Sequence, residues 1–230
     1  MSNNFYSSKS TVVVDGDIVI KHLKSITDTS AEAESIIKLS NFYSEPSFID
    51  GWCFDVVRLV RSPIGKSLFL KKAHGSAVSY YFFNSDKGLL ATEKMGQWLA
   101  HFHNKSNDTS GRVFSFGDFT IHNLILDFDS ASVTAIDPGI WGCTYQDRER
   151  DFLCGAISIA FFCWKNYRSE IPFLKSFIYG YRGVSKSRLD KLHLSRNIKE
   201  MELFGRSRKN HLKIRSLALR FAVKRLIRLL

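Results

Sequence analysis

The chain has 230 residues, of which 44% are hydrophobic and 24% are charged. This composition is typical of a folded globular protein and excludes a disordered or fibrous chain, and the length suffices for one large domain or two small lobes. The formal net charge is +11, but nine basic residues and no acidic residue lie from Arg206 to the C-terminus. The body is therefore close to neutral, which argues against nucleic-acid binding by the body and favours a local surface contact by the tail.

Cysteine spacing and the apolar segments indicate a reduced, cytoplasmic protein. The four cysteines form no Cys-x-x-Cys pair and have no histidine at zinc-ligand spacing. The first ten residues, MSNNFYSSKS, lack the apolar core of a signal peptide. The longest apolar run, Phe152–Trp164, is shorter than a usual membrane span and is expected to form a buried helix.

The N-terminal part predicts a small sheet with one helix. Thr11–Leu23 contains two β-branched runs joined at Asp15-Gly16-Asp17, a pattern typical of a hairpin. Thr29 or Ser30 is expected to cap a helix that runs through Phe42, with Glu32 in its first turn. Residues 53–63 and 66–75 are expected to form two further strands, with the turn at residues 62–65.

The remainder predicts helices around a short hairpin. Residues 88–105 are expected to form a helix, with Leu90, Met95, Leu99 and Phe102 on its core side. LILDF and SVTAID predict a hairpin that turns near residues 129–130, and helices are expected at 150–165, 173–181 and 210–230. The order predicts an α+β fold with a β-rich N-terminal lobe (1–75), a mainly helical C-terminal lobe (76–205) and a basic amphipathic helix (206–230).

Five polar residues stand in an order that is more informative than any one of them. Lys21 ends a strand, Glu32 lies in the following helix, GDFTIHN contains Asp118 and Asn123, and IDPG contains Asp137. Taken singly, these are an ordinary surface lysine, a favourable charge near a helix N-terminus and turn-forming residues. Together they are much less expected by chance, because an apolar triplet and then an Asp-x-Gly motif follow the G-D-x-x-x-x-N pattern at close spacing.

In this order the motifs resemble the protein-kinase-like superfamily, and especially its small-molecule branch. That branch contains aminoglycoside and choline phosphotransferases and the lipopolysaccharide Kdo and heptose kinases. Its members carry a strand lysine, a helix glutamate, a D-x-x-x-x-N loop and a following D-x-G, and the loop is typically HGDxxxxN, close to FGDFTIHN here. LAHFHNK before the loop also looks like its counterpart, as does Asp151 after it, with Asp147 as the alternative. The resemblance covers roughly Thr11–Tyr181.

The resemblance implies a bilobal phosphotransferase that uses ATP and Mg²⁺. Lys21 would contact the nucleotide phosphates and Glu32 would hold it in place. Asn123 and Asp137 would supply the hard oxygen ligands that Mg²⁺ prefers. Asp118 would orient the acceptor hydroxyl and take its proton.

Three features of the sequence depart from the family pattern, and the resemblance implies a supporting role for Asp151. Phe116 replaces the histidine before the Gly-Asp pair, a position that serves mainly in packing, and Pro138 inside D-x-G should stiffen that loop. No G-x-G-x-x-G precedes the strand lysine, so Ser8 and Ser10 are the candidates for phosphate contact there. Asp151 would accept backbone N–H bonds from the catalytic loop, while the histidines are expected at the surface or in packing.

The basic tail bears on the acceptor. Residues 210–230 place apolar side chains on one helical face and basic ones on another, as in helices that lie on anionic membranes. The alternative is a final helix that packs its apolar face on the C-terminal lobe. With membrane contact, the acceptor would be a lipid-linked sugar, such as one of the lipopolysaccharide core, at the cytoplasmic membrane face.

Two other classes remain as alternatives. A pseudokinase or scaffold would keep the fold without transfer, although the retention of Lys21, Asp118, Asn123 and Asp137 argues against it. A nucleic-acid-binding protein would use the basic tail, with steeply salt-dependent affinity. A kinase acting on proteins is disfavoured, because no A-P-E-like segment or long activation loop lies between Asp137 and Asp151.

Overall fold

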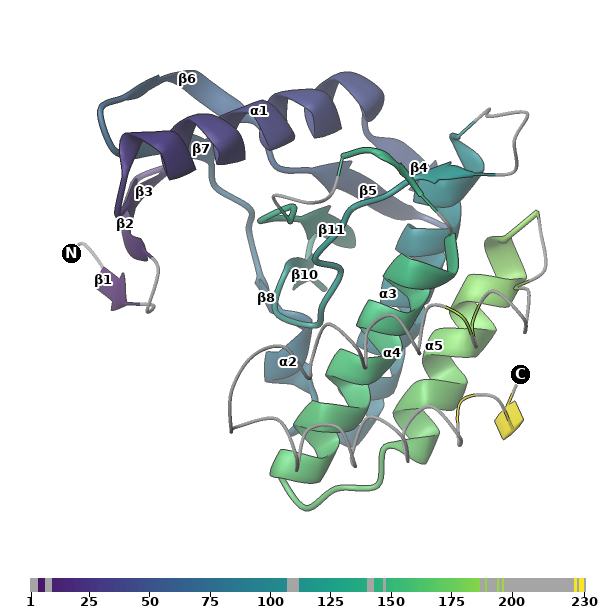
Figure 1. Cartoon of the computed structure of the whole chain (residues 1–230). Coiled ribbons are helices and arrows are strands. Elements are labelled where there is room, and N and C mark those ends of the chain that lie inside the picture. Colours follow the sequence, from purple (N-terminus) through teal and green to yellow (C-terminus); the bar gives the residue numbers. More distant parts are fainter. Residues whose placement is uncertain are drawn as a thin grey trace. The chain divides into compact units, whose positions relative to one another are not determined.

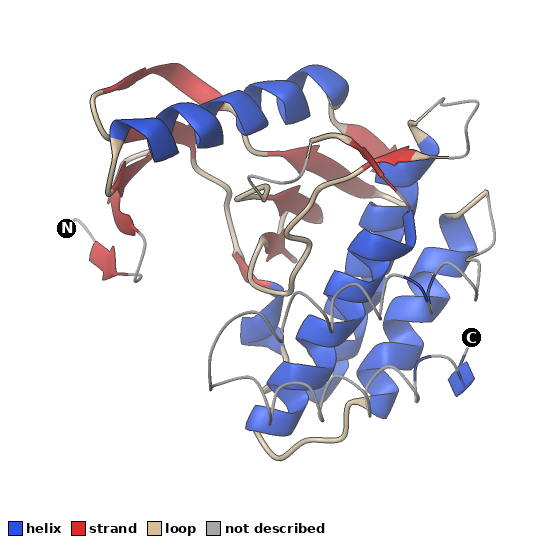
Figure 2. Cartoon of the chain, viewed as in Figure 1, coloured by secondary structure: helices blue, strands red, loops and turns tan. Residues whose placement is uncertain are grey.

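The computed structural model describes residues 4–6, 10–106, 112–139, 143–146, 148–186, 189, 194, 196, 226 and 228–229. The chain forms two units (Figure 1), of which the first comprises Met1–Ser76, Phe116–Asp118 and Asn123–Cys143. The second comprises Ala77–Ser115, Phe119–His122 and Thr144–Leu230. Most strands belong to the first unit and most helices to the second, as Figure 2 shows. The predicted α+β fold, with a β-rich N-terminal and a helical C-terminal part, is confirmed.

The first sheet has the strand order β1-β2-β3-β7-β6 and is antiparallel throughout. Its strands are β1 (Asn4–Tyr6), β2 (Ser10–Asp15), β3 (Ile18–Leu23), β6 (Leu59–Ile64) and β7 (Ser67–Lys71). The predicted hairpin is confirmed, and its turn uses Gly16 at φ +56°, a conformation that glycine adopts at low cost. Lys21 lies within the sheet, because it pairs with Val12 on β2 and with Leu68 on β7.

The expected single strand over residues 53–63 is wrong. Two strands replace it: β5 (Trp52–Val56) belongs to the second sheet and β6 to the first. Buried valines run across the break, at Val56 and Val57, so the apolar pattern gives no sign of it. The expected turn at 62–65 is also displaced, because β6 continues through Pro63 and Ile64 pairs with Ser67. Proline is tolerated there because β6 is an edge strand.

The second sheet has the order β4-β5-β11-β10-β8. Besides β5, its strands are β4 (Ser47–Ile49), β8 (Ser76–Ala77), β10 (Leu124–Asp127) and β11 (Ser132–Ala135). The predicted hairpin of β10 and β11 is confirmed, and β11 pairs in parallel with β5. The alternate residues Leu124 and Leu126 are fully buried. This burial fixes the register of the hairpin, which begins directly after Asn123 and ends just before Asp137.

Helix α1 (Ile26–Phe42) begins earlier than the sequence predicts. Its N-cap is Ser25, whose hydroxyl accepts a 3.0 Å hydrogen bond from the backbone N–H of Asp28, so the expected cap at Thr29 or Ser30 is wrong. Thr29 lies inside the helix and donates its hydroxyl to the Ser25 carbonyl. Glu32 therefore lies beyond the first turn, where its side chain is buried rather than placed at the helix end.

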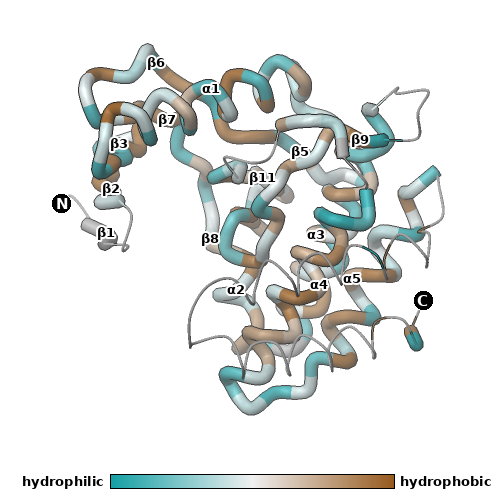
Figure 3. The backbone as a smooth tube through the Cα atoms, in the orientation of Figure 1, coloured by the Kyte–Doolittle hydropathy of each residue, from teal (hydrophilic) through white to brown (hydrophobic). Residues whose placement is uncertain are grey.

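The second unit packs its helices around an aromatic core. It contains α2 (Val78–Tyr81), α3 (Ser85–Asn104), α4 (Arg148–Lys165) and α5 (Ile171–Val184), with a small sheet of β9 (Val113–Phe114) and β12 (Tyr145–Gln146). Trp98 stacks on Phe102 and Phe119 at centroid distances of 4.9 and 5.6 Å. Hydrophobic positions recur along α4 and α5 (Figure 3). The predicted helix over Phe152–Trp164 forms and is buried along one side, whereas Trp164 at its end is 53% exposed. Leu90 was expected in the core but is 37% exposed.

Helices α3 and α5 approach closely at two glycines. A Cβ on Gly96 would lie 2.2 Å from the Phe177 carbonyl oxygen, and one on Gly180 would lie 2.1 Å from the Glu93 carbonyl oxygen. Such distances are possible only without a side chain, so the two glycines set the spacing between the helices.

In the part of the chain that the structure describes, no helix combines the length and the apolar character needed to cross a membrane.

Candidate active site

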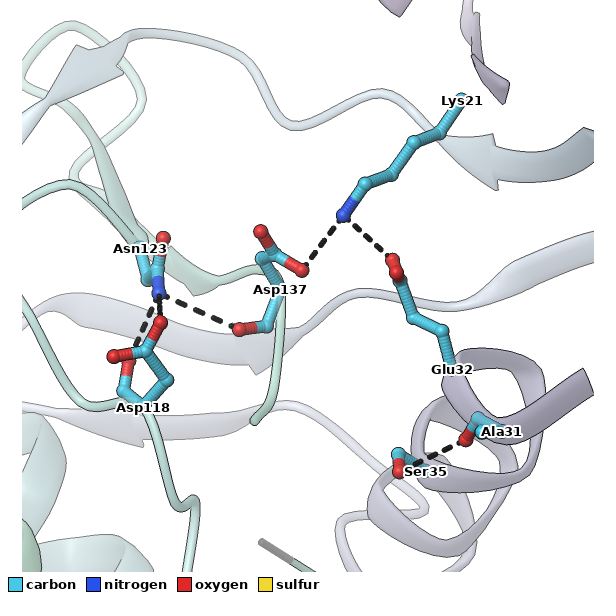
Figure 4. Close-up of polar contacts among 7 residues, drawn as sticks. All are labelled: Lys21, Ala31, Glu32, Ser35, Asp118, Asn123 and Asp137. Atoms are coloured by element: carbon cyan, nitrogen blue, oxygen red, sulfur yellow. Dashed lines mark hydrogen bonds and ion pairs between the residues drawn. The ribbon is translucent and has the colours of Figure 1, made fainter. Parts of the chain in front are cut away.

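Lys21, Glu32 and Asp137 meet within the first unit (Figure 4). The Lys21 ammonium donates to Glu32 Oε1 at 2.7 Å and to Asp137 Oδ1 at 2.8 Å. The Lys21 and Glu32 side chains are 12% and 8% exposed, whereas the Asp137 side chain is 47% exposed. Strand β3, helix α1 and the segment after β11 thus converge on one ammonium group, with Asp137 on its open side.

In this cluster the single Lys21 cation faces the two carboxylates of Glu32 and Asp137, and the pKa values of Lys21 and Glu32 are both raised. Burial alone would lower the pKa of Lys21, but the Asp137 and Glu32 carboxylates outweigh burial and raise the pKa above its usual value. Burial also raises the pKa of Glu32, and the opposing effect of Lys21 offsets only part of it, since Lys21 is shared with Asp137. Lys21 is therefore a firmly protonated cation between two carboxylates.

Helix α1 is fixed at its C-terminal end by Arg58, a residue that sequence reasoning missed. The Arg58 guanidinium donates to the Tyr43 carbonyl at 2.9 Å and to Asp55 Oδ1 at 2.8 Å. A cation at the last carbonyls of a helix is favourable. This contact ties the helix that carries Glu32 to strand β5. The signal in the sequence was a lone Asp and Arg inside a strongly apolar segment.

Hydrogen bonds between Asn123 and Asp118 join the two ends of the loop 118–123. The Asn123 side-chain amide donates to the Asp118 carbonyl at 2.9 Å, to Asp118 Oδ2 at 3.1 Å and to the Asp137 carbonyl at 3.4 Å. Asn123 is only 9% exposed, whereas Asp118 is exposed. The buried amide thus holds the exposed carboxylate in place and joins it to the segment that carries Asp137 (Figure 4).

The backbone at the two Asp-bearing segments adopts unusual conformations. Gly117 has φ +91° and Asp137 has φ +56°, a left-handed conformation that costs energy for a residue with a side chain. The Gly139 N–H donates to the Phe116 carbonyl at 3.2 Å, and a Cβ on Gly139 would lie 2.9 Å from the backbone nitrogen of Asp118. Gly139 is therefore required for this close approach, which explains the glycine of the Asp-Pro-Gly motif.

Phe116 is fully buried, in agreement with the packing role expected at this position. The residue before it, Ser115, belongs to the second unit and donates its hydroxyl to Asp151 Oδ1 at 2.9 Å. The Asp151 side chain is fully buried on α4, and its Oδ2 lies 3.5 Å from Nε2 of His103, whose Nδ1 is 3.0 Å from the Tyr181 hydroxyl.

Sequence reasoning did not bring Ser115, His103 and Tyr181 together with Asp151. A usable signal existed for His103, because it follows the core residue Leu99 by one helical turn. A histidine on an apolar helix face is expected to have a buried polar partner.

Comparison with known proteins gave matches only at the level of structure. No family model matches the chain, and no curated protein matches it. A choline/ethanolamine kinase family protein from Mesorhizobium loti superposes with a TM-score of 0.59 at 10% identity, covering 99% of this chain and 88% of that one. An amicoumacin kinase gives a TM-score of 0.57 at 14% identity, with the same coverage. An aminoglycoside phosphotransferase from Streptomyces rimosus gives 0.51 at 15% identity, covering 85% of this chain and 90% of that one.

The chain has the small-molecule kinase fold. At such low identities the likeness establishes the architecture that these proteins share. It confirms the resemblance that the motifs carried, since the kinase-like fold extends over nearly the whole chain.

The side-chain oxygen atoms of Asn123 and Asp137 suit a hard divalent cation. Figure 4 shows the amide oxygen of Asn123 and the Asp137 carboxylate oxygen that does not contact Lys21 pointing to the same side. Among the described residues, no group of three or more His, Cys, Asp or Glu side chains is placed to hold a metal ion. One carboxylate and one amide fit Mg²⁺, which usually keeps several waters and is completed by substrate phosphates.

The structure describes only some of the remaining predicted residues. Ser10 begins β2 and is half-buried, whereas Ser8 lies outside the described residues. Asp147, the alternative to Asp151, also lies outside them. Of the expected amphipathic helix over 206–230, the kinase-like structure describes only Leu226, Arg228 and Leu229, of which Leu226 is buried.

Proposed function

We propose that this chain is an ATP- and Mg²⁺-dependent phosphotransferase that phosphorylates a hydroxyl group of a small molecule. The observation that carries the proposal is the convergence of Lys21, Glu32 and Asp137 with the hydrogen-bonded Asp118 and Asn123. The solved neighbours support it: the amicoumacin kinase was solved with AMP-PNP and Ca²⁺. The aminoglycoside phosphotransferase was solved with ADP and streptomycin, in a structure with a TM-score of 0.50.

The nucleotide end of the site would depend on three residues. Mg-ATP supplies the transferable phosphoryl group and the divalent charge that neutralises its oxygens. Lys21 would bind nucleotide phosphates, which compete with Asp137 for the same ammonium, while Glu32 keeps the lysine side chain extended from β3. Asn123 and Asp137 would hold the metal through their oxygens. Ser8 and Ser10 are proposed to contact phosphate from the strand that precedes β3.

Asp118 would act at the acceptor end. Its exposed carboxylate is held by the buried Asn123 amide, so it can accept the proton of an acceptor hydroxyl without losing its position. As the acceptor oxygen forms its bond to the γ-phosphorus, the bond from that phosphorus to the β,γ-bridging oxygen breaks. The hydroxyl proton passes to Asp118 and ADP leaves. Asp151 would support the loop from the second unit through Ser115.

We further propose that the acceptor is a sugar, and that a lipid-linked sugar of the lipopolysaccharide core type is the specific case. The support is the cationic amphipathic pattern of residues 210–230, which suits an anionic membrane surface at the cytoplasmic face. Phosphate analysis of envelope glycolipids from cells with and without the gene tests this. An unchanged glycolipid phosphate content would exclude the lipid-linked acceptor and leave the transferase proposal standing.

The transferase proposal is tested with the purified full chain, γ-labelled ATP, Mg²⁺ and extracts of cells that lack the gene. Asp118→Asn should reduce label transfer about a thousandfold, since general-base groups contribute 10²–10⁴-fold. Asp129→Asn makes the same change at an exposed hairpin turn and should leave transfer unchanged. Transfer that persists in Asp118→Asn would refute the assigned role. Mg-ATP binding without transfer by the wild-type chain would instead identify a pseudokinase.

A further inference from the structure

Aromatic rings of different exposure cluster beside the exposed His122 side chain in the second unit. Phe162, on α4, meets His122 edge-on at a centroid distance of 6.0 Å, and Phe83, just after α2, lies 5.9 Å from Phe162. The Arg168 guanidinium carbon lies 5.5 Å from the centre of the Phe83 ring. We call Phe83, His122, Phe162 and Arg168 the ring patch.

The ring patch rests on a rigid base. Phe82 is fully buried and stacks on Phe173 at 4.4 Å, while it meets Phe162 edge-on at 5.2 Å. The Arg168 guanidinium donates to the Phe82 carbonyl, and His122 Nδ1 lies 3.1 Å from the Ser79 hydroxyl. These contacts fix the imidazole and the guanidinium before any ligand arrives, which lowers the entropic cost of binding.

Phe83 is not needed for the core on which the patch rests. Its side chain is 62% exposed, in contrast to the buried Phe82 beside it. The exposed Phe83 ring lies beside the fixed Arg168 guanidinium, and half-buried Phe162 connects it to the exposed His122 imidazole. This set has the composition of a ligand surface, where rings give contact area and a few polar groups give orientation.

The ring patch is joined covalently to the loop that carries Asp118 and Asn123. His122 is the residue before Asn123 and belongs to the same short segment as Asp118. One peptide bond keeps the α-carbons of His122 and Asn123 within about 3.8 Å. A compound that contacts the His122 ring therefore touches the residue that is bonded directly to Asn123, the proposed metal ligand.

We propose that the ring patch binds the acceptor, and that the acceptor is neutral or anionic and presents an apolar ring face. This inference rests on the proposed phosphotransferase function and names the substrate class of that site. The C–H face of a pyranose stacks on aromatic rings, and the imidazole can exchange hydrogen bonds with its hydroxyls. Arg168 attracts an anionic substituent and repels a cationic one, so a polycation such as an aminoglycoside is disfavoured.

The test fractionates the extract by charge before the reaction. Water-soluble and lipid extracts of cells lacking the gene are separated by ion exchange into cationic, neutral and anionic pools. Each pool is incubated with γ-labelled ATP, Mg²⁺ and either the wild-type chain or Asp118→Asn. We expect Asp118-dependent label in the neutral or anionic pool, and Asp118-dependent label confined to the cationic pool would overturn the inference.

Patch variants then separate acceptor binding from catalysis in the active pool. Phe83→Ala should raise the apparent KM for the acceptor pool about tenfold, with the KM for ATP unchanged, because ring stacking is lost. Phe83→Tyr keeps a ring and should restore the wild-type value. Tyr179→Ala removes a similarly exposed ring from α5, at 69% exposure, and serves as the control.

The outcomes distinguish the two levels of the proposal. Wild-type acceptor KM in Phe83→Ala overturns the ring patch while the transferase function stands. The absence of Asp118-dependent label in all pools means that the phosphotransferase function itself has failed, and the ring-patch inference fails with it.

Discussion

Lys21 and Glu32 form a 2.7 Å ion pair in which the helix carboxylate is only 8% exposed. The strand lysine is held from its buried side, while Asp137 approaches from the more open side. Glu32 therefore fixes the position of the ammonium, and under the proposed function Asp137 would be the partner that a nucleotide phosphate replaces.

Replacing Glu32 should weaken nucleotide binding more than it changes folding. Glu32→Gln removes the fixed negative partner, but Lys21 keeps the Asp137 carboxylate beside it, so the lysine charge stays paired and we expect only a small loss of stability. Mg-ATP affinity should fall about tenfold, because the lysine loses its orientation. Isothermal titration measures the affinity. The matched control is Glu34→Gln on the same helix, where Glu34 pairs with Lys38 at an exposed position. Equal affinities for the two variants would contradict the assigned role of Glu32.

Replacing Asp137 should abolish the metal dependence of nucleotide binding. In Asp137→Ala the carboxylate is lost while Glu32 still holds Lys21, so the fold should persist. The rise in unfolding temperature that ATP produces should then be the same with Mg²⁺ as with EDTA. Asp50→Ala is the control, because Asp50 is also an exposed aspartate with positive φ, at +49°. A retained Mg²⁺ effect in Asp137→Ala would exclude Asp137 as a metal ligand.

Replacing Gly180 or Gly183 of α5 by alanine should change the free energy of unfolding in opposite directions. Gly180→Ala should lower the free energy of unfolding by about 3 kcal/mol, since its Cβ would overlap backbone of α3 and force overpacking. Gly183 has nothing within 4 Å of its would-be Cβ. Gly183→Ala should therefore raise the free energy of unfolding by about 0.5–1 kcal/mol through helix propensity. Urea denaturation of both variants measures the difference, and equal effects would mean that α3 and α5 are not in close contact.

His101 should make the protein less stable in mild acid. Burial, followed by the charges of Lys105 and Lys186, lowers the pKa of His101 below its usual value of 6.5. The unfolded state then binds the proton more readily, so the contribution of His101 is fully present above pH 6.5 and is lost as the pH falls toward the folded-state pKa. Urea denaturation at several pH values should show a smaller decline between pH 7 and about pH 5 in His101→Gln than in the wild type. An equal decline of the free energy of unfolding in both proteins would show that another titratable group causes it.

The sequence predicted those parts of the fold that depend on local patterns. The hairpin over β2 and β3 follows from β-branched runs around a glycine turn, and the hairpin of β10 and β11 follows from alternation around a polar turn. The motif residues Lys21, Glu32 and Asp137 lie together in the structure, and the resemblance implied the contact of Glu32 with Lys21 but not that of Asp137, while the roles of all three remain predictions.

Features decided by competing tertiary contacts could not be read in the same way. The chain changes sheets after Val56, where uninterrupted apolar residues conceal the break. Ser25 rather than Thr29 caps α1, because Ser and Thr are nearly equivalent as caps and only the path of the backbone selects one. The contact of His103 with Asp151 joins residues of two helices, and no single-sequence pattern specifies it.

The parallel pairing of β11 with β5 determines when the second sheet can form during translation and which fragments of the chain can fold. Strand β5 gains its inner neighbour only after residue 135 has left the ribosome, so the nascent N-terminal segment carries an unpaired edge until then. Each unit is built from three separate segments of the chain, so no single cut of the chain releases a complete unit. A fragment that ends before Phe116 would keep β5 without β11, and an exposed edge of this kind favours aggregation during translation over independent folding.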